Sequence, residues 1–251
     1  MKRINFLMLV LVFLLPAGLV FAQSAENKDE KAPPKFDLDQ YQFGLLTRGP
    51  KWTAEKSPEI EKIQDGHMAN IRKMASLGKL IAAGPMMDDG ALGGIFIFKA
   101  ASLEEAQSLA AEDPAIKAGR LELTLFNWMG PKGIGVKLNE EFRKDPNTKM
   151  TMGKHHLVLL KKGPKWSGAQ TPENQKLQLA HMWFIKRMMD SGRMTAAGPL
   201  INGGDLQGLF VFDTESAQEA RTWAESDPKV KAGYLIVEIH PWYVAREVWP
   251  K

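Results

Sequence analysis

The sequence predicts an α+β fold in which two β-α-β-β-α-β units pack against each other sheet to sheet. Three observations lead to this prediction. The chain repeats itself at a constant offset, and each copy alternates strand-like and helix-like apolar patterns in the same order. An open sheet with helices on one face also needs cover on its other face. The chain of 251 residues therefore divides into two similar halves.

The repeat is in register and has no gap. Over residues 41–128, 35 of 88 positions are identical to the residue found 114 positions later, in 155–242. Single landmarks keep this offset, with 181 − 67 = 114 for two histidines and 227 − 113 = 114 for two Asp-Pro pairs. Duplication explains such a match better than chance does. Each unit is large enough to bury a modest core.

The order of elements is the same in both copies. Ser57 and Thr171 each precede a proline, and a hydroxyl N-cap followed by proline is a strong helix start. The first copy contains a predicted strand over 41–47, a helix from 58, strands over 80–86 and 94–98, a helix from 102 and a strand over 121–128. This is the split β-α-β pattern of ferredoxin-like folds. We expect the two copies to form an internal pseudo-dimer, an α/β barrel with a pseudo-two-fold axis.

Composition and punctuation divide the chain into five segments. The residues before the first copy are polar and include two adjacent prolines, and the residues between the copies are rich in Gly, Pro and Lys. We predict a signal peptide over 1–22, a disordered tether over 23–40, the first repeat over 41–128, a linker over 129–153 and the second repeat over 154–246. A short helical turn is expected at 140–144 within the linker.

The N-terminal segment has the layout of a secretory signal peptide. A positive end at Lys2 and Arg3 precedes the apolar run Phe6 to Leu15, and Ala22 is a suitable cleavage position. The alternative is an uncleaved membrane anchor, because the apolar run approaches spanning length. The chain has no cysteine, which excludes a lipid-modified cysteine and disulfides. We expect a periplasmic or secreted protein that is cleaved after Ala22 and then has no membrane contact.

Charge and motifs exclude several classes of function. The net charge of +4 falls to +2 when the two positive residues of the signal peptide are removed, and the lysines are scattered. This gives no support to nucleic-acid binding. The sequence has no phosphate-binding glycine loop, nucleophile elbow or zinc motif, so it predicts no cofactor and no metal.

An ordered set of short motifs occurs in both copies. They are a histidine on the first helix, a Gly-x-Leu/Met-x-Ala-Ala-Gly-Pro stretch, a Ser-x-x-Glu-Ala helix and an Asp-Pro-x-x-x-x-Gly end, found at His67, 78–85, 102–106 and 113–119 and again 114 positions later. In this set the chain resembles the YCII-related (YciI-like) family over roughly 41–128 and 155–242. The resemblance implies a dimeric α/β barrel of ferredoxin-like fold and an enzymatic site at the recurring His and Asp. It also places the chain near lactone isomerases, dehydrochlorinases and monooxygenases. The export signal, the tandem copy and a long Trp-containing loop depart from the family pattern.

The candidate catalytic residues are two histidines and two aspartates. His67 and His181 lie on the helix face that should contact the sheet, and a histidine near neutrality can take and return a proton. Asp113 and Asp227 are the expected partners that orient each imidazole. The alternatives are a core histidine bonded to a backbone carbonyl and an aspartate that only ends its helix.

The substrate-pocket candidates lie in loops and bends. We expect a pocket near the Gly-Pro bends, and two tryptophans could cover it or cap a sheet edge: Trp52, Gly84, Pro85, Trp166, Gly198 and Pro199. Asp88 and Asp89 are interpreted as turn formers, because the second copy has Asn202 and Gly203 there. The prediction is an exported protein that binds a small organic molecule, with isomerisation or elimination as the chemistry. The alternatives are a non-catalytic binding module and an assembly module with an exposed sheet.

Overall fold

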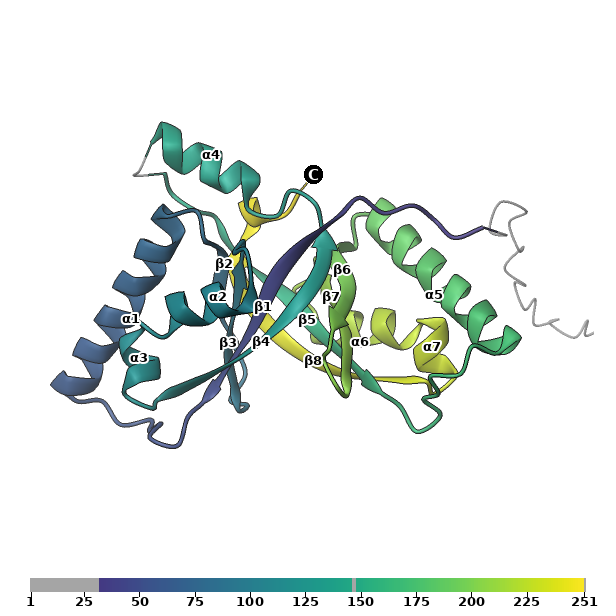
Figure 1. Cartoon of the computed structure of the whole chain (residues 1–251), viewed down its shortest axis with the longest axis horizontal. Coiled ribbons are helices and arrows are strands. Elements are labelled where there is room, and N and C mark those ends of the chain that lie inside the picture. The colour runs from purple at the N-terminus through teal and green to yellow at the C-terminus, as the bar shows by residue number, and fades with distance from the viewer. Residues whose placement is uncertain (1–31, 146–147, 251) are drawn as a thin grey trace, which may run out of the picture.

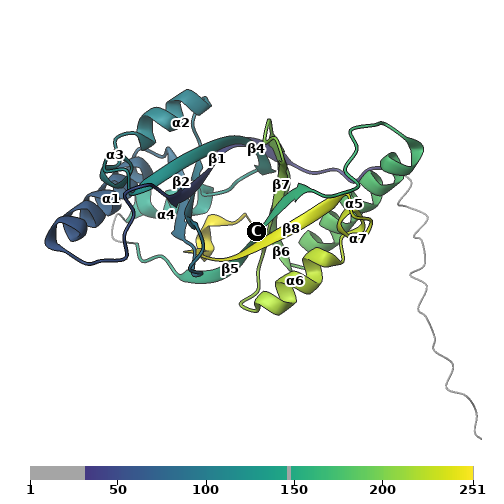
Figure 2. The same cartoon turned by 90° about the horizontal axis from the view of Figure 1, so that it is seen from below.

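The computed structural model describes residues 32–145 and 148–250, so the predicted signal peptide (1–22) and residues 23–31 of the predicted tether (23–40) lie outside the described residues. Eight antiparallel strands form one sheet in the order β2-β3-β1-β4-β6-β7-β5-β8. The helices of the two halves lie at opposite ends of the molecule, with the strands between them (Figures 1 and 2). The predicted pair of β-α-β-β-α-β units is confirmed.

The two halves contain equivalent elements. In the first half these are β1 Leu38–Arg48, α1 Pro58–Ser76, β2 Leu80–Pro85, β3 Leu92–Phe98, α2 Leu103–Ala110, α3 Pro114–Lys117 and β4 Leu121–Pro131. In the second half they are β5 Met152–Lys162, α5 Pro172–Asp190, β6 Met194–Ile201, β7 Leu206–Phe212, α6 Ala217–Glu225, α7 Pro228–Lys231 and β8 Leu235–Ala245. The linker contains α4 Val136–Lys144, and a 3-10 helix, Arg246–Val248, follows β8.

The long helices begin where the sequence predicts. The Ser57 side chain accepts a hydrogen bond from the Ile60 N–H at the start of α1, and Thr171 does the same for Asn174 at the start of α5. Both helices end at a glycine in the left-handed conformation. These local signals therefore begin and end α1 and α5 at equivalent residues.

The sheet closes into a barrel along two equivalent seams. Trp128 of β4 pairs with Leu200 of β6, and Trp242 of β8 forms a bridge to Met86 at the end of β2. Met86 and Trp128 lie 114 positions before Leu200 and Trp242, so the seams are related by the pseudo-two-fold axis. The interior core combines side chains of both halves, among them Phe43 and both seam tryptophans. Separate apolar layers fill the space between each half's sheet and its helices.

Two segments contain more regular structure than the sequence predicts. β1 begins at Leu38, because residues 38–40 pair with the end of β4 at Met129–Pro131. In the linker, α4 extends beyond the expected turn at 140–144 and places Leu138 and Phe142 against the barrel core. None of the helices in the described part of the chain is long and apolar enough to cross a membrane.

Candidate functional site

His67 and Asp113 form the first pair. His67 Nδ1 lies 2.8 Å from Asp113 Oδ2, and the carboxylate is fully buried. Asn70, one turn along α1, donates from Nδ2 to the same oxygen at 3.3 Å. The Ala115 N–H donates to Asp113 Oδ1 at 2.9 Å, so the second oxygen caps α3. Asp113 therefore contacts the histidine and also caps the start of α3, whereas the alternative interpretation from the sequence was an aspartate that only ends the preceding helix.

His181 and Asp227 form the second pair. His181 Nδ1 lies 2.6 Å from Asp227 Oδ2, and this carboxylate is also fully buried. Asp227 Oδ1 accepts from the N–H groups of Lys229 at 2.8 Å and Val230 at 3.2 Å. The predicted contact between each histidine and its aspartate is thus present in both halves, while a catalytic role stays a prediction.

Electrostatics fix which imidazole nitrogen carries the hydrogen. A carboxylate only accepts, so Nδ1 donates and Nε2 of the neutral ring is left as the base. Burial alone raises the pKa of Asp113, but the hydrogen bond from His67, the positive charge of that ring when it is protonated, and the hydrogen bonds from Ala115 and Asn70 bring the pKa below its usual value. The pair is therefore set up with an ionised carboxylate.

Nε2 of each ring is uncommitted. Neither His67 Nε2 nor His181 Nε2 has a hydrogen-bond partner among the described residues. Some polar atoms of the described residues are buried without a partner, but these two nitrogens do not belong to that group. The side chains are 11% and 12% exposed, and the rings pack on Phe96 and Phe210 at centroid distances of 6.1 and 6.0 Å. Each ring is held in place while one nitrogen remains within reach of solvent.

The two tryptophan candidates have different surroundings. Trp166 lines an open groove of about 540 Å³ beside α5, together with Gln178 and Lys229. Trp52 is 38% exposed and lies under the Arg48 guanidinium, 3.9 Å from the ring centroid. Of the two tryptophans, Trp166 is therefore the one that lines this groove.

The Gly-Pro bends lie at the barrel seams. A Cβ on Gly84 would lie 2.0 Å from the Tyr243 carbonyl oxygen, and a Cβ on Gly198 would lie 1.8 Å from that of Met129. Trp242 Nε1 donates to the Gly84 carbonyl at 3.1 Å. These glycines allow the backbones of the two halves to approach closely. The prolines that follow them, Pro85 and Pro199, are exposed.

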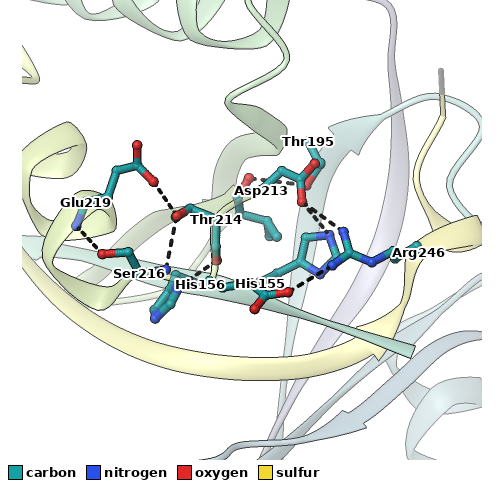
Figure 3. A network of polar contacts seen from close by, with 10 residues as sticks. His155, His156, Thr195, Asp213, Thr214, Ser216, Glu219 and Arg246 are labelled. Carbon is teal, nitrogen blue, oxygen red and sulfur yellow. Dashed lines mark hydrogen bonds and ion pairs between the residues drawn. The ribbon is translucent and has the colours of Figure 1, made fainter. Parts of the chain in front are cut away.

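A polar network in the second half, which the sequence does not predict, surrounds His155 and His156 (Figure 3). His155 is buried, with Nε2 3.6 Å from Asp213 Oδ1, and Arg246 Nη1 lies 3.4 Å from the same oxygen. His156 Nδ1 donates to the Thr214 carbonyl at 2.9 Å. Burial lowers the pKa of both histidines, and the Asp213 carboxylate opposes this at His155. The signal in the sequence was the His-His pair, which has no counterpart in the first copy.

One contact joins the halves through a turn that was expected to have a purely local role. His240 Nδ1 lies 2.8 Å from Asp88 Oδ2 of the first half, and His240 Nε2 lies 2.8 Å from Glu238 Oε1. Asp88 therefore contacts the other half besides forming its own turn. Within residues 32–145 and 148–250, no group of three or more His, Asp or Glu side chains is placed to hold a metal ion.

Comparison with solved structures supports the barrel. Two mutant structures of chlorite dismutase from Candidatus Nitrospira defluvii match with TM-scores of 0.54 and 0.53. Each match covers 85% of this chain and 93% of the other at 10% identity. At this identity the likeness shows the fold alone, which is that of the chlorite dismutase-like dimeric α/β barrels.

Sequence comparison identifies the family. The uncharacterized protein YjpA of Bacillus subtilis (strain 168) is 35% identical over 63 residues, which are 25% of this chain and 72% of that protein. The YCII-related domain matches residues 46–128 and 155–243, one match in each half. The chain therefore belongs to the YCII-related family and carries its domain twice.

Proposed function

We propose that the protein binds a small organic molecule, not nucleic acid, and moves one of its protons with His67–Asp113 and His181–Asp227. The observation that supports this most directly is that the two nitrogens of each imidazole have different surroundings. Nδ1 is committed to a buried carboxylate, and Nε2 is free of protein partners within the described residues. The same arrangement orients the base in other proton-transferring sites.

The chemistry requires only this pair of side chains. Nε2 removes a proton from a carbon next to an electron-withdrawing group, and the aspartate stabilises the imidazolium that forms. In an isomerisation the proton returns to a different carbon of the same molecule. In an elimination the C–H electron pair becomes a C=C bond while the leaving group departs with its own pair, and water then takes the proton from the histidine.

The alternative is a binding module in which the histidines are structural. The packing of His67 on Phe96 and of His181 on Phe210 favours it, because both rings also serve the layer between helix and sheet. In that case the pocket holds a ligand and leaves it unchanged.

A ligand screen by thermal shift on residues 23–251 begins the test, because specific binding raises stability by mass action. Hits are then incubated in D2O, and incorporation of deuterium at carbon is followed by NMR.

We expect H67N/H181N to bind the hit and to lose exchange, because asparagine keeps a donor for each aspartate and removes Nε2. H156Q, which introduces the residue of the first copy at a buried histidine elsewhere, is the matched control. Exchange that survives in H67N/H181N would reject the catalytic proposal.

The proposal includes export to the periplasm or the medium. Its support is the sequence of the first 22 residues, with a positive end, an apolar run and Ala22 before Gln23. Intact mass of the full-length gene product made in a bacterium tests it. A chain that begins at Gln23 is expected, and a full-length chain in the membrane fraction would contradict it.

A further inference from the structure

The groove beside α5 is lined by neighbours of the second His–Asp pair, among them Gln178, Met182 and Lys229, while His181 and Asp227 themselves do not line it. Asp227 contacts His181 through Oδ2 and the Lys229 N–H through Oδ1, so one carboxylate links the histidine to the groove. Gln178 lies one turn before His181 on α5 and accepts a hydrogen bond from Lys229 Nζ. The Lys229 ammonium lies 5.9 Å from the centroid of the Trp166 ring, which forms another wall. A molecule in this groove would contact Gln178, Met182 and Lys229, which lie beside the His181–Asp227 pair.

Lys229 gives the groove a positive charge. Among the described residues that line it, Lys229 is the one charged side chain. No described carboxylate forms an ion pair with its ammonium group within 4.0 Å. Burial lowers the pKa of Lys229 and the Asp227 charge opposes this, which means that the ammonium has lost part of its water. An anion that replaces this lost solvation is favoured.

The equivalent positions of the first half carry a formal charge of the opposite sign. Ala115 stands where the second half has Lys229, and Asp65 stands where it has Leu179. Of the remaining lining positions, Gln170 and Gln175 correspond to Lys56 and Glu61. One lysine and two acids make a formal charge of −1 in the first half, against +1 from the single lysine in the second. The two copies have therefore diverged in charge around a shared His–Asp pair.

We propose that the groove of the second half binds a small organic carboxylate, with the carboxylate on Lys229 and an apolar or planar body against Trp166. The first half does not share this site. The proposal deepens the proposed function and rests on it, since it assigns a ligand class to the groove beside the His181–Asp227 pair. Its test is independent of turnover, because it measures binding only.

Methionine methyl groups report on both halves at once. Met182 lines the groove, and Met68 is its equivalent in the first half. In the chain 23–251 labelled with 13C at the methionine methyls, we expect benzoate to shift the Met182 signal and to leave Met68 unchanged. Benzamide, which has the same ring and no charge, should shift neither. Equal shifts at both methionines, or an equal response to benzamide, would overturn the proposal.

Substitutions at Lys229 separate charge from packing. K229M keeps the aliphatic stem and removes the ammonium, and we expect it to weaken benzoate binding at Met182 at least about tenfold. K229R should retain binding, as should H181N, whose loss of Nε2 affects the catalytic proposal alone. The reciprocal variant D65L/A115K should make Met68 respond to benzoate. Binding that is unchanged in K229M would refute the role of the lysine and leave the histidine proposal standing.

Discussion

In the first half His67 shares its carboxylate with Asn70, whereas in the second half Phe184 stands at the equivalent position. The distances within the pairs are nevertheless similar, 2.8 Å for His67–Asp113 and 2.6 Å for His181–Asp227. Duplication has preserved the pair and released its neighbours. The pair is therefore the part common to both copies, and differences in substrate or strength of binding must come from the residues around it.

The same contrast occurs at the outer end of the first strand of each half. Lys99 Nζ lies 2.5 Å from Asp39 Oδ2 and 4.7 Å from the centroid of the Tyr41 ring. In the second half Asp213 occupies the position of Lys99, and it contacts His155 and Arg246. The sign of the charge is reversed, and in each half a group of opposite sign lies close to it. The charge at this edge therefore differs between the copies, while the backbone pairing of β1 with β3 and of β5 with β7 is the same.

The largest expected effects concern the seams, where each half has a Gly-Pro bend against the backbone of the other half. We predict that G84A and G198A each destabilise the protein by about 3 kcal/mol or prevent folding, because each added Cβ would meet a carbonyl oxygen of the other half at 2.0 Å or less. Urea unfolding at pH 7.5 measures the change. G168A is the control, since nothing lies within 4 Å of its added Cβ. A loss below 1 kcal/mol at either seam would show that the halves need not approach so closely.

Acid should affect the second half more than the first. Burial holds the pKa of His155 and His156 below the unfolded value of about 6.5. Their contribution to stability is therefore complete above that pH and declines as the pH falls toward their folded pKa values. Replacing them by the residues of the first copy, in H155Y/H156Q, should reduce the loss of unfolding free energy between pH 7.5 and 5.5 by about 1 kcal/mol.

Urea unfolding of the wild type and of H155Y/H156Q at both pH values provides the comparison. The charged neighbours Asp213, Arg246 and Lys154 are present in both proteins, and so are the other histidines, so their contributions cancel to first order. Identical pH dependence in the two proteins would mean that neither buried histidine titrates differently on folding.

The seam tryptophans offer a finer comparison. Trp242 Nε1 donates to the Gly84 carbonyl, whereas Trp128 Nε1 is buried without a partner within the described residues. We predict that W242F costs about 1 kcal/mol more than W128F, because only the former removes a hydrogen bond and both changes remove the same ring atoms. Thermal or urea unfolding of the two variants side by side measures the difference. Equal losses would show that the two seams are energetically equivalent despite this bond.

The sequence predicted those parts of the fold and site that rest on local signals. Helix starts follow from Ser57 and Thr171, whose caps involve residues three positions away. The His67–Asp113 contact was expected because two helices of one unit lie on the same sheet face. The roles of Gly84 and Asp88 were not predicted, because their partners Tyr243 and His240 lie more than 150 positions away in the other half. Contacts between halves depend on the seam geometry, which no local pattern encodes.

The smallest expected effect tests whether the reversed charges are coupled. K99D alone places a second acid beside Asp39 and should cost about 0.5 kcal/mol, since both groups are more than a third exposed and solvent screens them. The Lys99 hydrogen bond lowers the pKa of Asp39, and so this contribution is present above the ordinary carboxyl pKa and lost in acid.

The double variant D39K/K99D restores opposite charges with the polarity of the second half. We expect it to recover most of the loss in urea unfolding at pH 7.5 and low salt. Recovery would show that the favourable sign of the charge at position 99 depends on the charge at position 39. A double variant no more stable than K99D would show that the first half depends on a lysine at this position for another reason, such as its contact with the Tyr41 ring.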